Sequence, residues 1–108
     1  MLQSQVTANG VMTTPPIEII PSQWFAGVGI LVTIPNGVIA TYTVQISGDS
    51  PHVNPTNWNN HDVLTNQSSS ANSNLAYPAT WLRLNVTAYS GADKIVMNVV
   101  QVTSSQTN

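Results

Sequence analysis

The sequence predicts an all-β protein, an antiparallel β-sandwich of jelly-roll-like form with about six to eight strands. Apolar and polar residues alternate with the period of two that is typical of strands. The most regular alternation is at 38–48, where one series is Ala40, Tyr42, Val44 and Ile46 and the other is Thr41, Thr43, Gln45 and Ser47. Glycine, proline and asparagine separate the apolar segments at short intervals, as turns require. No segment has the periodicity of an amphipathic helix.

The chain has 108 residues, which is long enough for one domain with its own core and too short for two. Residues 1–14 are mostly polar and are followed by Pro15 and Pro16, which disfavour a helix and favour extended chain. We therefore predict an N-terminal arm at 1–14, a single β-sandwich domain at 15–103, and a polar C-terminal tail at 104–108.

Two turn signals organise the first half of the domain. A short strand at 17–20 is followed by a longer one at 24–34, in which Gly27 and Gly29 lie on the face opposite the apolar residues. We expect a neighbouring strand or sheet to pack over these glycines. The sequence Pro35-Asn36-Gly37 then predicts a hairpin, so that 24–34 and 38–48 pair antiparallel.

Residues 48–60 are rich in turn formers and predict a long loop, with Trp58 as a candidate anchor. A short strand at 61–64 and an exposed polar loop at 66–74 are expected next. Strands at 81–89 and 94–102, joined by a turn at 90–93, predict a second hairpin. The last of these strands is apolar on both faces, which places it in the centre of its sheet or under a partner.

Charge is scarce in this sequence. It has two Lys or Arg residues, four Asp or Glu residues and a formal net charge of -2, whereas about a quarter of an ordinary soluble domain is charged. An uncharged polar surface can be covered by another protein without burying unpaired ions, which favours a part of an assembly. Two basic residues cannot make the phosphate contacts of a nucleic-acid-binding protein. The longest apolar run, 24–34, is too short for a membrane helix.

No catalytic, metal or cofactor site is predicted. His61 and Asp62 are adjacent, but no glycine-framed serine or second structured carboxylate accompanies them. We interpret His61 as a residue that hydrogen-bonds within its loop. The His and Asp residues match no compact metal motif, and there are no cysteines. The first residues lack the pattern of a signal peptide, so we expect synthesis in a cytoplasm.

A protein interface is the favoured role for Trp81, Arg83 and Tyr89, which the alternation places together on the outward face of their strand. The alternative is that this face is the inner side of the second sheet, with Trp81 in the core and Arg83 at the sheet edge. Trp58 is a further interface candidate. Trp58 and Tyr77 together also allow a carbohydrate-binding module, because aromatic rings in polar loops stack on sugars.

From residue 38 onward the chain resembles small virion-associated proteins of tailed bacteriophages and prophages. The segments that carry the resemblance are Thr41-Tyr42-Thr43-Val44-Gln45, Asp49, Pro51, Trp58-Asn59-Asn60-His61-Asp62-Val63-Leu64, Ser70-Ala71-Asn72-Ser73-Asn74, Tyr77-Pro78-Ala79, Leu82-Arg83-Leu84-Asn85-Val86-Thr87 and Val99-Val100-Gln101. Together they cover about two thirds of the chain. The first third does not contribute.

The resemblance implies a β-sandwich or jelly-roll decoration (cement) protein. Such a protein sits on the phage head, is bound to the major capsid protein and braces neighbouring subunits. It further implies a homo-oligomer, a dimer or trimer, and no catalytic residues. The expected location is the virion, after synthesis in the bacterial host. Similar small β-domains also occur in necks, tails and fibres, so these positions are alternatives to the head.

Overall fold

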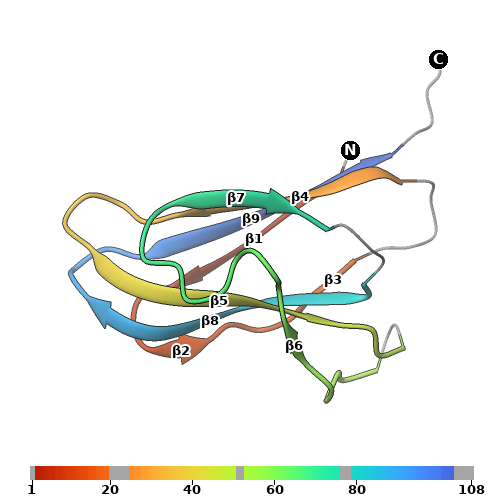
Figure 1. The fold of residues 1–108 in the computed structure, drawn as a ribbon, viewed down its shortest axis with the longest axis horizontal. Helices are drawn as coiled ribbons and strands as arrows, with labels where there is room; N and C mark the ends of the chain where they lie inside the picture. Colours follow the sequence, from red (N-terminus) through yellow and green to blue (C-terminus); the bar gives the residue numbers. More distant parts are fainter. Residues whose placement is uncertain (1, 20–24, 51–52, 76–78, 104–108) are drawn as a thin grey trace.

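A computed structural model of the protein describes residues 2–19, 25–50, 53–75 and 79–103, and these residues form nine β-strands and no helix. The described part of the chain thus has no helix long and apolar enough to cross a membrane. The strands are β1 (Leu2–Ala8), β2 (Met12–Thr13), β3 (Ile17–Glu18), β4 (Phe25–Thr33), β5 (Ile39–Ser47), β6 (Asn59–Asn60), β7 (Ala71–Asn74), β8 (Trp81–Ser90) and β9 (Ile95–Thr103). They form two antiparallel sheets in separate layers (Figure 1).

The order of the strands is that of a jelly roll. The four-stranded sheet runs β1-β9-β4-β7, and the five-stranded sheet runs β2-β8-β5-β6 with β3 also paired to β8. Early strands therefore pair with late ones, and the chain crosses between the layers at every connection except β2–β3 and β5–β6. Because β2 and β3 lie along the same strand, the nine strands occupy eight positions. The predicted antiparallel sandwich is confirmed.

Both predicted hairpins are wrong. β4 pairs with β7 and β9, whereas β5 pairs with β6 and β8, so the strands on either side of Asn36-Gly37 belong to different sheets. The turn itself exists, since the Val38 N–H donates to the Pro35 carbonyl at 3.2 Å and Gly37 has a φ of 86°. In the same way, β8 and β9 flank the turn at 90–93 but lie in opposite sheets. A turn signal fixes where the chain reverses; it does not fix whether the strands pair side by side or face each other across the core.

The two turns touch each other at Gly91. A Cβ atom at this position would lie 3.0 Å from the Gly37 carbonyl oxygen and 3.0 Å from the Val38 Cα, and Gly91 has a φ of 146°. Glycine is required there for two reasons, because the backbone conformation disfavours an L side chain and the space is filled by backbone atoms. The contact holds the two connections between the sheets together at one end of the sandwich.

Gly91→Ala is therefore expected to lower the free energy of unfolding by about 1–3 kcal/mol, from backbone strain and from displacement of the Gly37 turn. Gly10→Ala is the matched control, since a Cβ atom there has nothing within 4 Å. It should change stability by less than about 0.5 kcal/mol. Urea unfolding curves of the three proteins make the comparison. Equal midpoints for wild type and Gly91→Ala would show that the turns do not depend on this contact.

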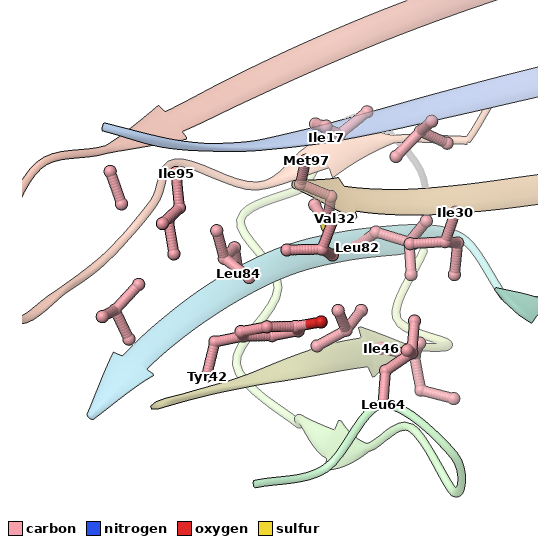
Figure 2. Close-up of a cluster of buried hydrophobic side chains, with 14 of the residues drawn as sticks. Ile17, Ile30, Val32, Tyr42, Ile46, Leu64, Leu82, Leu84, Ile95 and Met97 are labelled. Atoms are coloured by element: carbon pink, nitrogen blue, oxygen red, sulfur yellow. The ribbon is translucent and has the colours of Figure 1, made fainter. Parts of the chain in front are cut away.

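The core lies between the sheets and is made from the inward series of each strand. Figure 2 draws 14 of its residues and labels Ile17, Ile30, Val32, Tyr42, Ile46, Leu64, Leu82, Leu84, Ile95 and Met97. Leu64 does not belong to a strand, and it enters the core from the connection between β6 and β7. The alternation at 38–48 is confirmed, because its apolar series is buried.

The N-terminal segment belongs to the sandwich and is not an arm. β1 pairs with β9 along its whole length, from Leu2↔Gln101 to Ala8↔Ile95, and Ala8 is only 1% exposed. β2 and β3 then pair with β8 on either side of the two prolines. Strand pairing thus begins at Leu2, before the boundary expected at residue 15. The predicted tail at 104–108 lies outside the described residues.

Between β2 and β3, Thr14 hydrogen-bonds to β8 directly before Pro15 and Pro16, which have no N–H to donate. Its N–H donates to the Leu84 carbonyl at 2.9 Å, and its Oγ1 accepts from the Leu84 N–H at 3.0 Å. Thr14 is buried, so both groups would otherwise lie unpaired away from water. One threonine therefore carries the pairing with β8 across the proline interruption.

β9 is central in its sheet, between β1 and β4, as expected; its outward Val96 and Val100 are only half-buried. No described element packs over Gly29; the nearest atom to a Cβ built there is the Val100 oxygen at 3.9 Å, an ordinary contact. The expectation of a covering strand is therefore wrong for Gly29. The expectation cannot be followed at Gly27, whose surroundings are not described, and Trp24 lies outside the described residues. The segment 66–74, expected to be a loop, contains the edge strand β7.

Candidate protein interface on the five-stranded sheet

Trp81 and Arg83 lie on the outer face of the five-stranded sheet, the face turned away from the four-stranded sheet. Leu82 and Leu84 alternate with them and are fully buried, so β8 has the expected orientation at this point. Cross-strand pairs place Arg83 opposite Gln45 and Trp81 opposite Ser47. The prediction that Trp81 and Arg83 share an outward face is confirmed, and both side chains are half-buried there.

Arg83 is held by two neighbours. Its Nε donates to Oε1 of Gln45 at 2.7 Å, and the centre of its guanidinium lies 4.1 Å from the centroid of the Trp58 ring. Nε2 of Gln45 in turn donates to Oδ1 of Asn60 at 3.2 Å. Burial lowers the pKa of the guanidinium from its ordinary value, and the group stays charged at any physiological pH. We call Trp58, Arg83, Gln45 and Asn60 the Arg83 cluster.

The cluster is preorganised, because the stacked indole and the amide fix an otherwise flexible side chain. A cation over an aromatic ring contributes roughly 0.5–2 kcal/mol, more where water is excluded. Among the described residues, Gln45 alone accepts a hydrogen bond from this guanidinium, and the donor is Nε. The terminal nitrogens therefore have N–H groups to offer to carbonyl or carboxylate oxygens of a partner. Such a group can bind without a large loss of side-chain entropy.

Trp81 is fixed from the neighbouring loop. Its Nε1–H donates to the Ser50 carbonyl at 3.2 Å, so the polar group of the indole is satisfied while the ring stays half-buried. Aromatic rings with a satisfied polar group are frequent at protein interfaces. Trp81 thus extends the surface of the Arg83 cluster toward the loop at 48–58.

Asp49 organises this loop. Its carboxylate accepts hydrogen bonds from the N–H of Thr56 at 2.7 Å, from the N–H of Asn57 at 3.0 Å and from Nδ2 of Asn57 at 3.1 Å. These bonds, led by the one from Thr56, hold the pKa of Asp49 below its ordinary value. Trp58 is the next residue after Asn57, so the carboxylate fixes the backbone that places the Trp58 ring against Arg83.

Acid is expected to loosen the loop. The pKa of Asp49 is lower in the folded than in the unfolded chain. The ionised carboxylate therefore contributes fully to the stability of the folded state above the unfolded pKa of about 3.9. This contribution is lost as the pH falls through the folded pKa. The protection of the Thr56 and Asn57 amides against hydrogen exchange, taken relative to the intrinsic rate at each pH, measures the effect and should fall in acid. Asp49→Ala should cause the same loss of protection at neutral pH, whereas Asn54→Ala, a change in the same loop, should not. Unchanged exchange in Asp49→Ala would contradict the role of the carboxylate.

The structure does not bring Tyr89 to this face. The register of β5 and β8 shifts between Thr41↔Ala88 and Tyr42↔Val86, which leaves Thr87 as an extra residue in β8. A β-bulge of this kind reverses the faces of the residues beyond it. Tyr89 therefore lies opposite the buried Ala40 and packs against the core. The prediction that it lies beside Trp81 and Arg83 is wrong for this reason.

The ring of His61 is buried and hydrogen-bonds to backbone groups. Its Nδ1 lies 3.1 Å from the N–H groups of both Val63 and Leu64, and its Nε2 lies 2.9 Å from the Asn74 carbonyl. Since Nδ1 accepts, the tautomer carries its hydrogen on Nε2, which donates to Asn74. Asp62 lies 3.5 Å from Nδ1 and is exposed. His61 thus ties the connection after β6 to the end of β7, in agreement with its interpretation as a hydrogen-bonding loop residue.

Within the described residues, no three His, Asp or Glu side chains are grouped as a metal site would need.

The carbohydrate hypothesis relied on Trp58 and Tyr77. The Trp58 ring is stacked with Arg83, and Tyr77 lies outside the described residues. Gln45 and Asn60 were not predicted as partners of Arg83. The outward position of Gln45 on β5 was visible in the alternation, but its register against Arg83 was not.

The arrangement offers a fixed arginine, two half-buried indoles and amide groups on a largely uncharged sheet face. These features suit binding to another protein. Comparison of the chain with protein-family models, curated proteins and solved structures found no match.

Proposed function

We propose that the protein is a structural component of a bacteriophage virion, a capsid decoration protein that binds the assembled head and stabilises it. The observation that carries the proposal is the Arg83 cluster, an immobilised arginine stacked on Trp58 on a sheet face with few charges. The resemblance of the sequence to small virion-associated proteins supports the same role. The partner is then the major capsid protein, and the site of action is the head surface.

The proposed mechanism is mass action. A protein that binds the assembled shell and not the separate subunits stabilises the shell in proportion to its occupancy. The faces of the sandwich suit this role, because uncharged Thr, Gln and Asn side chains can be covered with little cost of desolvating ions. Arginine and tryptophan are the residue types most enriched among those that dominate binding energy at interfaces.

Removal of the Arg83 side chain tests the proposal. Purified particles without the protein are incubated with wild type, Arg83→Ala or Lys94→Ala, and the bound fraction is measured with the temperature of DNA release. We expect Arg83→Ala to weaken binding roughly 30-fold, a loss of about 2 kcal/mol, and to leave particles that release DNA at a lower temperature. Lys94→Ala is the matched control, because it removes the other basic residue, which is exposed and outside the cluster.

Equal binding by Arg83→Ala and wild type would contradict the role of the cluster. Wild-type protein that leaves the temperature of DNA release unchanged would contradict the decoration role itself. The alternative positions in the virion give a different result. A protein of the neck, tail or fibre gives density at that place and has few copies relative to the major capsid protein. A cryo-EM map of the particle distinguishes these positions.

A further inference from the structure

The four edge positions of the two sheets differ in how well they are protected. In the five-stranded sheet, one edge is made of β2 and β3, two residues each with Pro15 and Pro16 between them, and the other is β6, also two residues long. In the four-stranded sheet, β7 has four residues. Short strands, irregular pairing and proline are the usual means of preventing an edge from pairing with another chain.

The fourth edge, β1, has none of these protections. It is seven residues long, Leu2–Ala8, and pairs with β9 without a register shift. Its sequence, Leu-Gln-Ser-Gln-Val-Thr-Ala, contains no proline, glycine or charged residue. Its one pairing partner among the described strands is β9, so the backbone groups on its other side are available. A long, regular and uncharged edge is a template for a further strand.

We propose that β1 pairs antiparallel with β1 of a second copy of the chain, about a two-fold axis at Gln5. The pattern of β1 is self-complementary about this residue. On the exposed side Gln5 meets Gln5 of the second copy, and Gln3 and Thr7 meet each other, so that the contacts are between uncharged hydrogen-bonding side chains. On the core side, Ser4 and Val6 meet each other, and the half-buried Val6 gains cover.

The surroundings of β1 favour a second copy over a charged partner. Uncharged residues lie side by side across the outer face of the four-stranded sheet. Gln5 is paired with Asn98, Asn98 with Leu31, and Leu31 with Asn72. Two such faces can be joined into one eight-stranded sheet with no like charges placed opposite each other. Pairing through a single strand buries a small area, so we expect a reversible dimer whose fraction depends on concentration.

The inference goes beyond the capsid role and does not depend on it. Its experiments use the purified chain without particles, so a failure to dimerise and a failure to bind heads are separate results. Sedimentation velocity over a range of concentrations should show wild-type dimers. Gln5→Lys and Gln5→Glu should each shift the chain to monomer, because the two-fold axis places like charges opposite each other. A mixture of the two variants should restore dimers.

Asn72→Lys is the matched control, because it adds the same charge to an exposed position on the same face but at the β7 edge. It should sediment as wild type does. A wild-type chain that remains monomeric at every concentration would overturn the proposal. Loss of dimers in Asn72→Lys as strongly as in Gln5→Lys, or a mixture of the Lys and Glu variants that stays monomeric, would overturn the pairing at β1.

Introduced cysteines test the register, since the chain has no other cysteine. Directly opposed residues of antiparallel strands have Cα atoms about 4.5–5.5 Å apart, within the range of a disulfide. Gln5→Cys should therefore form a disulfide-linked dimer under mild oxidation. Gln3→Cys should not, because the two copies of residue 3 are four positions out of register, about 13 Å along the strand. Equal cross-linking of both variants would contradict the two-fold axis at Gln5.

Discussion

Replacing His61 by alanine is expected to lower the free energy of unfolding by about 3 kcal/mol or more. The change leaves the N–H groups of Val63 and Leu64 and the carbonyl of Asn74 without their partner; the bond to Leu64 is buried and the other two are partly buried. Each unsatisfied buried group costs about 1–3 kcal/mol, and the missing ring leaves a cavity beside them. Leu64, whose N–H is one of these groups, fills the core, so the loss should spread to the packing between the sheets.

Guanidinium unfolding followed by tryptophan fluorescence measures this change. Asp62→Asn is the control, because Asp62 is exposed and adjacent to His61, and it should shift stability by less than about 0.5 kcal/mol. Hydrogen exchange adds a local readout, since the amides of Val63 and Leu64 should lose protection in His61→Ala. A loss below about 1 kcal/mol would mean that water replaces the ring, and the connection would then not depend on His61.

The sandwich could be predicted from the sequence because one face of each long strand is apolar. Strands close to β4, β5, β8 and β9 were predicted from alternation and turn residues, and these four form the centre of the two sheets. Burial of one face is a local property, since it depends on which side chains lie at alternate positions. The same pattern correctly placed Trp81 and Arg83 on an outer face.

The pairing of the strands could not be predicted in this way. The turn at Asn36-Gly37 is compatible with a hairpin and with a connection between sheets, and the choice depends on contacts far apart in sequence, such as Gly91 against Gly37. Tyr89 shows the same limit within one strand. A bulge at Thr87 reverses its face, and nothing in the local alternation marks the extra residue.

β1 and β7 were missed because their own residues favour strands weakly. β7 is Ala-Asn-Ser-Asn, a sequence typical of a loop, and it is a strand because β4 offers it an edge. β1 has few apolar residues and is fixed by pairing with β9 along its whole length. Both strands depend on neighbours distant in the chain, and the unprotected edge on which the dimer proposal rests became visible only when β1 was placed in the sheet.

Tyr42 is expected to make the protein lose stability in alkali. Its side chain is fully buried, its hydroxyl donates to the Ser69 carbonyl at 3.0 Å, and burial raises its pKa to about 12. The ordinary value is about 10, so the unfolded chain loses this proton first. The contribution of the phenol is therefore complete below pH 10 and declines as the pH rises toward 12. Two pKa units at about 1.4 kcal/mol each predict a total loss of roughly 3 kcal/mol.

Tyr42→Phe separates this effect from general alkaline denaturation. The variant should be less stable than wild type at neutral pH by about 1 kcal/mol, because the Ser69 carbonyl loses its donor. Above pH 10 its stability should fall less steeply, since the buried ring can no longer ionise, and the two curves should converge and then cross. Urea unfolding at a series of pH values measures both slopes. Parallel curves would mean that the hydroxyl reaches water in the folded state, and the connection at Ser69 would then have to open without unfolding the sandwich.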